Sequence, residues 1–242
     1  MSNPFTIALG KLVQRAARLK GGSGSAFPGL LVETLEPDFA VRALEGLSRG
    51  VVVISGTNGK TTTAKIVTEL LQANGLKVFT NSTGSNFMRG VIASLLSQIT
   101  LFGRLDADIA VLELDEAHAV HFVKKIAPRY SLLLNVMRDQ LDRFGEIDHT
   151  ADLLAVIAAH TTEVVVINRE DNRLARFASR EDLRVSETSA SHSAHFVWYG
   201  LAPELLPRFP QDDELYADGL GQGVVGQGAR SSVPEIANSG SH

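Results

Sequence analysis

A glycine-rich stretch that ends in lysine and threonine carries the clearest chemical signal in the chain. The stretch, GTNGKT at residues 56–61, follows the apolar run VVVIS, and Ile54 stands where the general phosphate-loop motif has its first glycine. Glycines let backbone N–H groups converge on phosphate oxygens, a following helix directs its positive end at them, and Lys60 adds a charge. The hydroxyl of Thr61 suits Mg²⁺. The pattern predicts a short nucleotide phosphate loop in preference to a threonine-capped glycine turn.

Acidic side chains follow a second apolar run. The run IAVLEL contains Glu113, and Asp115 and Glu116 come directly after it. Glu113 and Asp115 are two residues apart, so they share a face of an extended chain. Carboxylate oxygens are the ligands that a hard cation such as Mg²⁺ prefers. This segment therefore predicts a magnesium site, with a solvated acidic loop as the alternative.

Three further polar clusters have two interpretations each. NVMRDQLDRFGEIDHT begins at Asn135 and is either part of a site or a helix start with ion pairs. Asn168 in NREDN can read an adenine edge, although an asparagine after a strand is more often a turn or a cap. TNSTGSNFMRG, residues 80–90, suits either an approach to the terminal phosphate or a plain turn.

Short apolar runs alternate with helix-length segments, which favours an α/β fold. Strands are predicted within residues 51–55, 76–80, 109–114, 131–135 and 163–168, and helices near 60–74, 91–98, 117–126 and 148–160. Because several runs are uniformly apolar, we expect a mostly parallel sheet flanked by helices on both faces. Ligands in such folds bind at the carboxyl ends of the strands, where the polar clusters lie.

Both ends of the chain differ from this central region. In residues 1–50 we predict an N-terminal helix and a connecting segment. The helix carries an apolar stripe of Phe5, Leu9, Leu12, Ala16 and Leu19, with basic side chains off it. The stripe could contact a membrane surface or a partner, but its narrowness favours packing on the domain. Residues 201–242, rich in glycine and serine, are predicted to be a disordered tail.

Composition limits the classes of function. The chain has 242 residues, 44% of them hydrophobic, and a net charge of -4, so no overall field attracts nucleic acid or anionic lipid. It has no cysteine, which excludes a disulfide framework, a thiolate zinc site and a cysteine nucleophile. No apolar run approaches the roughly 20 residues of a membrane span. A cytoplasmic protein is expected, either free or at the inner face of the membrane.

Taken together, these motifs resemble the central ATP-binding domain of the Mur ligase family. The resemblance rests on SGTNGKTTT, TNSTGSN, LELDEAH, NVMRDQLDRFGEI and the Asn168 cluster, and covers about Phe27 to Gly200. RDQLDRFGEI is most similar to the amidating subunit type of lipid II isoglutaminyl synthase, with Gln140 where most Mur ligases have histidine. That subunit type amidates the D-glutamate of lipid II with ammonia from a glutaminase partner, a step of peptidoglycan biosynthesis.

The resemblance assigns expected roles to individual residues. It implies that Thr61 and Glu113 hold Mg²⁺, that Asn168 and Asp171 hold the nucleoside, and that Lys60 and Glu113 are catalytic. The ATP phosphates would be held by Gly56, Thr57, Asn58, Gly59, Lys60, Thr61 and Thr62. In such ligases a carboxylate attacks the γ-phosphate to form an acyl phosphate, which ammonia or an amine displaces.

Three features depart from the family pattern. The four-cysteine zinc ribbon of the amidating subunit type is excluded, so no zinc is expected. NREDN replaces the more usual Asn-Ala-Asp-Asp-Pro, and the family's C-terminal ligase domain is not expected in residues 201–242, after the central domain expected at residues 51–200. A nucleotide-binding module without ligase activity is therefore one alternative. A folylpolyglutamate synthase-like ligase is another, against which RDQLDRFGEI argues.

Overall fold

The computed structural model describes residues 3–19, 26–81, 86–137, 146–179, 194–201 and 205. Residues Met1–Gly200 form one compact unit, and Leu201–His242 form a second. Nearly all of the tail predicted to be disordered therefore lies outside the described residues. No helix in the described ranges is both long and apolar enough to cross a membrane.

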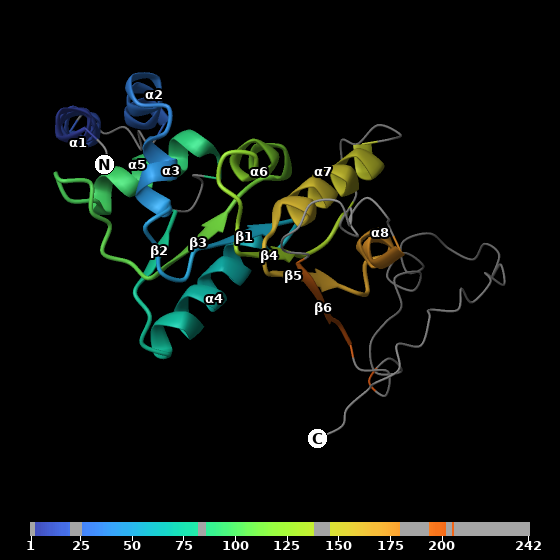
Figure 1. The fold of residues 1–242 in the computed structure, drawn as a ribbon. Coiled ribbons are helices and arrows are strands. Elements are labelled where there is room, and N and C mark those ends of the chain that lie inside the picture. The colour runs from blue at the N-terminus through green and yellow to red at the C-terminus, as the bar shows by residue number, and fades with distance from the viewer. Residues whose placement is uncertain are drawn as a thin grey trace, which may run out of the picture. The chain divides into compact units, whose positions relative to one another are not determined.

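The first unit is built on a six-stranded sheet in which all neighbouring strands pair in parallel, in the order β2-β3-β1-β4-β5-β6 (Figure 1). The strands are β1 (Val51–Ser55), β2 (Val78–Thr80), β3 (Ile109–Glu113), β4 (Tyr130–Leu133), β5 (Val164–Asn168) and β6 (His195–Tyr199). This arrangement confirms the predicted α/β fold. Because the strands are parallel, their carboxyl ends meet at one edge of the sheet, where the polar clusters begin.

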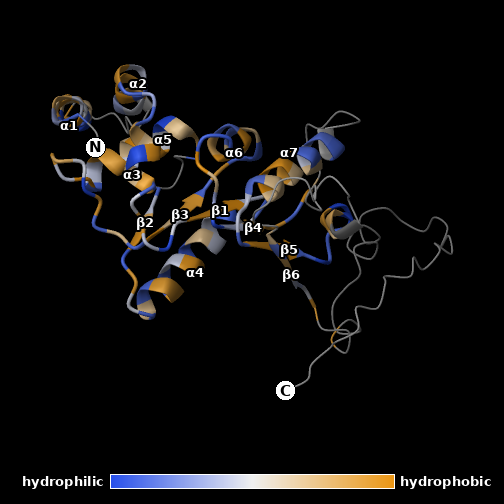
Figure 2. Ribbon diagram, in the orientation of Figure 1, coloured by the Kyte–Doolittle hydropathy of each residue, from blue (hydrophilic) through white to orange (hydrophobic). Residues whose placement is uncertain are grey.

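Helices lie on both faces of the sheet. Helix α4 (Lys60–Ala73) lies on one face, and α5 (Met88–Gln98), α6 (Glu116–Val123) and α7 (Glu146–His160) lie on the other (Figure 1). Side chains of β1 alternate between the two layers: Val51 and Val53 join the larger core, while Val52 and Ile54 pack with Ala64 of α4. Figure 2 shows the apolar central strands between these layers.

The covering of the sheet is uneven from centre to edge. Strand β1 is buried along its whole length, and β3 is buried except at its last residue, as expected for strands covered on both faces. Strands β4 and β5 alternate between buried and half-buried residues, and β6 alternates between half-buried and exposed ones. The prediction of helices over both faces is confirmed, and among the described residues burial is deepest at the centre of the sheet and decreases towards β6.

Three N-terminal helices complete the first unit: α1 (Pro4–Leu19), α2 (Ala26–Leu35) and α3 (Phe39–Leu44). Helices α2 and α3 were not predicted from the sequence. Helix α2 packs against both α1 and α5, and Phe39 and Leu44 of α3 are fully buried in the larger core. The segment expected only to connect the first helix to the sheet therefore contributes side chains to the core.

Helix α1 packs on the domain as favoured, but not through its apolar stripe. The residues that it buries are Thr6, Ile7, Gly10 and Gln14. A Cβ atom at Gly10 would lie 2.7 Å from Val32 Cγ2 of α2, so the two helices approach closely there. The amide of Gln14 donates a hydrogen bond of 2.8 Å to the carbonyl of Ala93 in α5. The stripe consequently faces away from the domain.

Close contact between α2 and α5 gives a stability prediction. A Cβ atom at Gly29 would lie 2.0 Å from the carbonyl oxygen of Arg89, which is a backbone atom and cannot rotate away. We expect Gly29→Ala to lower the free energy of unfolding by about 1–3 kcal/mol, because the helices must separate. Gly46→Ala, where a Cβ meets nothing within 4 Å, is the control for urea unfolding. Equal effects of the two substitutions would contradict the packing described.

Candidate functional site

The loop between β1 and α4 has a backbone that requires glycine at two positions. Gly56 has φ of 132° and Gly59, the N-cap of α4, has φ of 86°. A Cβ atom at Gly56 would also lie 2.9 Å from the backbone nitrogen of Asn135, in the loop after β4. Helix α4 begins at Lys60, directly after this loop, and Thr62 is exposed in its first turn. The first N–H groups of a helix lack partners within it and attract anions.

Lys60 folds back over this loop. Its ammonium donates hydrogen bonds to the carbonyls of Gly56 (2.7 Å) and Thr57 (3.3 Å), and it forms an ion pair of 3.3 Å with Asp115 Oδ1. The Lys60 side chain is only 13% exposed, so the charge is partly shielded from water. The amide of Asn86 donates a short hydrogen bond to the other oxygen of Asp115. The loop thus holds a positive charge at the carboxyl end of the sheet.

Thr61 and Glu113 bring two oxygen ligands together. Thr61 Oγ1 donates a hydrogen bond of 2.7 Å to Glu113 Oε1. The side chain of Asn81 fixes the backbone of Glu113: its Oδ1 accepts from Glu113 N at 2.9 Å, and its Nδ2 donates to Glu113 O at 2.8 Å. The hydroxyl and the carboxylate are hard oxygen donors of the kind that Mg²⁺ prefers.

In the part of the chain that the structure describes, no group of three or more histidine, cysteine or acidic side chains could hold a metal ion. A site with one carboxylate and one hydroxyl agrees with that result. Magnesium in nucleotide sites takes only one or two carboxylates from the protein and completes its shell with phosphate oxygens and water. The residues present therefore fit a magnesium ion that arrives with a nucleotide.

Asn135 joins the loop after β4 to the phosphate loop. Its Oδ1 accepts a hydrogen bond from Asn58 N at 2.9 Å, and its Nδ2 donates to Asn58 O at 3.0 Å. Its backbone carbonyl accepts from Thr57 N at 3.0 Å. The sequence indicated Asn135 only as the start of a charged cluster. Its place directly after a buried strand was the available signal for this contact, and Asn81 after β2 shares that signal.

Asn168 and Asp171 lie at the same edge, after β5. Asn168 Oδ1 accepts a hydrogen bond from Glu170 N at 3.0 Å, which is the turn contact that the sequence offered as the alternative. Asp171 is the N-cap of α8 (Asn172–Ala175), which is followed by a 3₁₀ turn, Arg176–Ser179. The remaining oxygen of Asp171 accepts from Val136 N at 2.5 Å. Both side chains thus already accept hydrogen bonds within the protein, and their role with a nucleoside remains a prediction.

Tyr199, at the end of β6, borders this part of the edge. Its hydroxyl donates a hydrogen bond of 3.3 Å to the carbonyl of Leu134. Burial, and then the negative charge of Asp171, raise the pKa of the Tyr199 phenol, so it stays neutral and remains a donor near physiological pH. Tyr199 was not singled out from the sequence.

Several residues named from the sequence lie outside the described residues. They are Gln140, with Arg138, Asp139, Asp142 and Arg143 of the motif that begins at Asn135, and Ser82–Ser85 of the loop after β2. Glu146 begins α7, but its side chain is not described.

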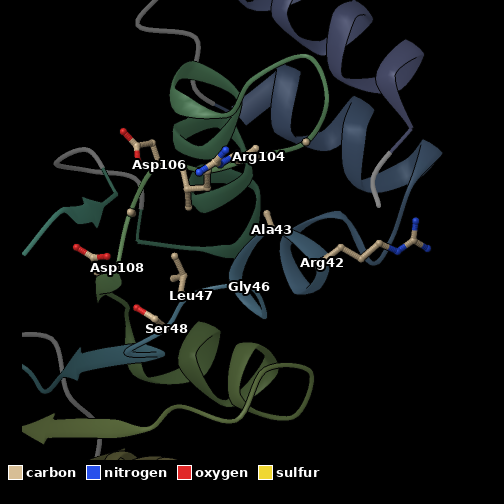
Figure 3. A pocket seen from close by; sticks show the side chains of 11 residues that line it. Arg42, Ala43, Gly46, Leu47, Ser48, Arg104, Asp106 and Asp108 are labelled. Atoms are coloured by element: carbon tan, nitrogen blue, oxygen red, sulfur yellow. The ribbon is translucent and has the colours of Figure 1, made fainter.

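A cavity of about 410 Å³ lies away from this site (Figure 3). It is lined by residues 46–48, before β1, and 103–108, before β3, together with Arg42 and Ala43 of α3, and so lies at the amino ends of the strands. Three of its charged side chains have protein partners: Arg42 pairs with Glu36, Asp106 pairs with Lys77, and Asp108 accepts a hydrogen bond of 2.8 Å from Lys77 N. The cavity lies at the opposite ends of the strands from the phosphate loop, on which we base the functional site.

Comparison with known proteins agrees with this geometry. Residues 54–203 match the family model "Mur ligase middle domain". The chain is 31% identical over 190 residues to the MurT subunit of lipid II isoglutaminyl synthase (glutamine-hydrolyzing) from Staphylococcus aureus, covering 78% of this chain and 42% of the relative. It is 34% identical over 150 residues to MurT of Streptococcus pneumoniae, covering 61% and 32%. The chain thus spans less than half the length of these relatives.

A solved structure shares the fold. The MurF ligase of Thermotoga maritima in complex with ADP superposes with a TM-score of 0.54 at 26% identity, covering 70% of this chain and 36% of that one. The family-model match covers most of the first unit, and the resemblance inferred from the sequence motifs is confirmed. The chain belongs to the Mur ligase family.

Proposed function

We propose that this chain binds Mg-ATP at the carboxyl end of its sheet and uses it to activate a carboxylate for amide formation. The observation that carries the proposal is the Thr61–Glu113 hydrogen bond beside the Lys60–Asp115 ion pair, at the start of α4. These contacts support a cation site beside a phosphate-binding lysine. When nucleotide binds, the Lys60 ammonium would exchange its contacts with the loop carbonyls and Asp115 for phosphate oxygens.

The proposed chemistry follows from what a carboxylate can do. A carboxylate cannot expel oxide, so attack of a carboxylate oxygen on the γ-phosphorus of ATP first releases ADP and gives an acyl phosphate. Ammonia then attacks the acyl carbon, loses a proton and expels phosphate, which leaves the amide. Bound Mg²⁺ would offset negative charge on the phosphates. Lys60 would bind the transferring group, Thr61 and Glu113 would orient the cation, and Asn135 would hold the loop in place.

The acceptor that we propose is the D-glutamate α-carboxylate of lipid II, with ammonia supplied by a glutaminase subunit. Support comes from the MurT relatives, which are subunits of a glutamine-hydrolysing lipid II isoglutaminyl synthase. Because the chain spans 42% of the first relative, the complete reaction is proposed for an assembly that includes this chain. With this membrane-linked substrate, the reaction would take place at the cytoplasmic face of the membrane.

A turnover assay tests this proposal. The chain is mixed with a glutaminase subunit, lipid II, glutamine and Mg-ATP, and phosphate release and amidated product are measured. We expect ATP turnover that depends on both glutamine and lipid II. ATP binding with no turnover under any of these conditions would instead support a nucleotide-binding module without ligase activity.

The contact between Asn135 and the phosphate loop gives a further prediction. Asn135→Ala removes both side-chain hydrogen bonds to Asn58, and we expect ATP affinity to fall about tenfold, since each such bond contributes about 0.5–1.5 kcal/mol. Hydrogen exchange of residues 57–59 should also speed up. Asn74→Ala, at the other end of α4, is the control and should leave affinity within about twofold. Unchanged affinity in Asn135→Ala would contradict a positioning role for Asn135.

A further inference from the structure

Helix α1 exposes apolar side chains that its sequence would lead one to expect in the core. Phe5 is 72% exposed, Leu12 is 65% exposed and Leu19 is 89% exposed. These three residues are seven apart and lie nearly in line along the helix, with the half-buried Leu9 and the exposed Ala16 between them. We call this set, Phe5, Leu9, Leu12, Ala16 and Leu19, the α1 stripe.

The orientation of the α1 stripe is fixed by contacts on the opposite face of the helix. Gln14 donates its hydrogen bond to Ala93 O from a buried position, and Ile7 is fully buried. Gly10 allows the close approach of Val32 in α2 and Leu96 in α5. Turning the stripe inward would break the buried hydrogen bond and replace a glycine contact with bulky side chains. The outward position of the stripe is therefore part of the fold.

Basic side chains run along one flank of the α1 stripe. With about 100° of rotation per residue, Lys11, Arg15 and Arg18 fall between the stripe and the packed face. Helix α1 contains no acidic residue, and no ion pair among the described residues involves these three side chains. Burial, and then the charge of Arg15, lower the pKa of Lys11. The flank is thus a local positive patch on a chain whose net charge is -4.

We propose that α1 docks the protein onto an anionic lipid membrane, with the α1 stripe inserted at the interface and Lys11, Arg15 and Arg18 directed at lipid headgroups. Apolar side chains beside a row of cations are the features of a helix that lies in the membrane plane. The long stems of lysine and arginine can follow the apolar surface while their charges reach the headgroups. This binding site goes beyond the proposed function, because it needs neither nucleotide nor acceptor.

Charge and shape favour lipid over a protein partner. A single narrow row of large side chains offers a shallow contact, which suits the upper acyl region of a bilayer. Three cations without a described acidic partner are complementary to an anionic lipid surface, where each nearby lysine or arginine adds to binding. Helix α1 is also too short and too polar to span the membrane, so attachment at the surface is the mode that its sequence allows.

Vesicle flotation tests the proposal. The protein is mixed, at low salt and without nucleotide, with phosphatidylcholine vesicles or with vesicles that contain about one third phosphatidylglycerol. We expect at least about tenfold stronger binding to the anionic vesicles, lost as ionic strength rises. Leu12→Gln with Leu19→Gln should reduce binding at least about tenfold, and Arg15→Gln with Arg18→Gln should remove the preference for anionic lipid.

The chain offers a matched control for the apolar substitutions. Leu101 and Phe102 are also exposed, between α5 and β3, and Leu101→Gln with Phe102→Gln should leave vesicle binding within about twofold. All substituted side chains are exposed or form no described core contact, so thermal unfolding and ATP binding should not change. Retained ATP binding separates failure of this proposal from failure of the proposed function.

Three results would overturn membrane docking. The first is parent protein that binds neither kind of vesicle. The second is equal binding by the parent and by Leu12→Gln with Leu19→Gln. The third is a parent that forms oligomers in light scattering, loses them on the same substitutions and never binds vesicles, which would make the α1 stripe a protein interface.

Discussion

Lys60→Ala is expected to weaken Mg-ATP binding by roughly 10- to 150-fold. A charge-assisted hydrogen bond contributes about 1.5–3 kcal/mol, and Lys60 is the cation that the structure places over the phosphate loop. The Lys60 side chain is only 13% exposed, so water screens the interaction less than on an open surface. Calorimetric titration with ATP in excess Mg²⁺ measures the change.

Lys65→Ala is the matched control for this substitution. Lys65 lies on the same helix, one turn further on, and its ion pair with Glu69 is at the exposed surface. Removing it deletes the same charge without touching the loop, and affinity should change less than about threefold. If Lys65→Ala and Lys60→Ala weakened ATP binding equally, the cause would be the change in overall charge. The proposal that Lys60 binds the phosphates would then be wrong.

Glu113→Gln is expected to raise the Mg²⁺ concentration needed for half-maximal ATP binding by at least about tenfold. The substitution removes a negative ligand, while the amide oxygen can still accept the hydrogen bond from Thr61 Oγ1. Asn81 continues to hold the backbone of residue 113, so the fold should be unaffected. Loss of one hard carboxylate ligand should therefore lower the affinity for Mg²⁺ rather than the affinity for the nucleotide.

Titration of Mg²⁺ at fixed ATP separates these two effects. ATP binding in EDTA should be similar in the parent and in Glu113→Gln, because the substituted side chain is placed to hold the cation. Glu116→Gln, which deletes the same charge three residues later in the first turn of α6, should shift the Mg²⁺ dependence less than about threefold. A Glu113→Gln protein with the Mg²⁺ dependence of the parent would contradict the cation site.

The central sheet and the chemical centre of the site could be predicted from the sequence because both have local signals. The apolar runs at β1, β3 and β5 are continuous, and their parallel pairing brings the residues that follow them to one edge. Lys60 and Thr61 come after β1, Glu113 ends the neighbouring β3 and Asp115 follows it, so the Thr61–Glu113 and Lys60–Asp115 contacts form at that edge.

The amide contacts around the site could not be predicted, since they depend on tertiary geometry. Asn81 and Asn135 follow strands and Asn86 precedes α5, and asparagine in such positions usually makes a turn or a cap. Only the assembled sheet places Asn135 against Asn58 and Asn81 against Glu113. The sequence marks Asn81 and Asn135 by their place after a strand but does not indicate their partners.

Prediction failed most clearly in the N-terminal region. Helix α2 is apolar on most sides and so lacks the period that identifies a surface helix, and α3 is only six residues long. Helix α1 shows the opposite difficulty: its periodic stripe is real, but glycine and glutamine on the other face form the packed surface. Hydrophobic periodicity identifies the apolar face of a helix but does not show whether that face packs against the core.

Calorimetric titration of the parent protein with ATP, in Mg²⁺ and in EDTA, tests the central claim most directly. We predict one binding site per chain that is strengthened by Mg²⁺ and abolished or severely weakened in Lys60→Ala. A parent protein that binds no ATP under either condition, or a Lys60→Ala protein that binds as the parent does, would contradict a nucleotide site at the loop between β1 and α4.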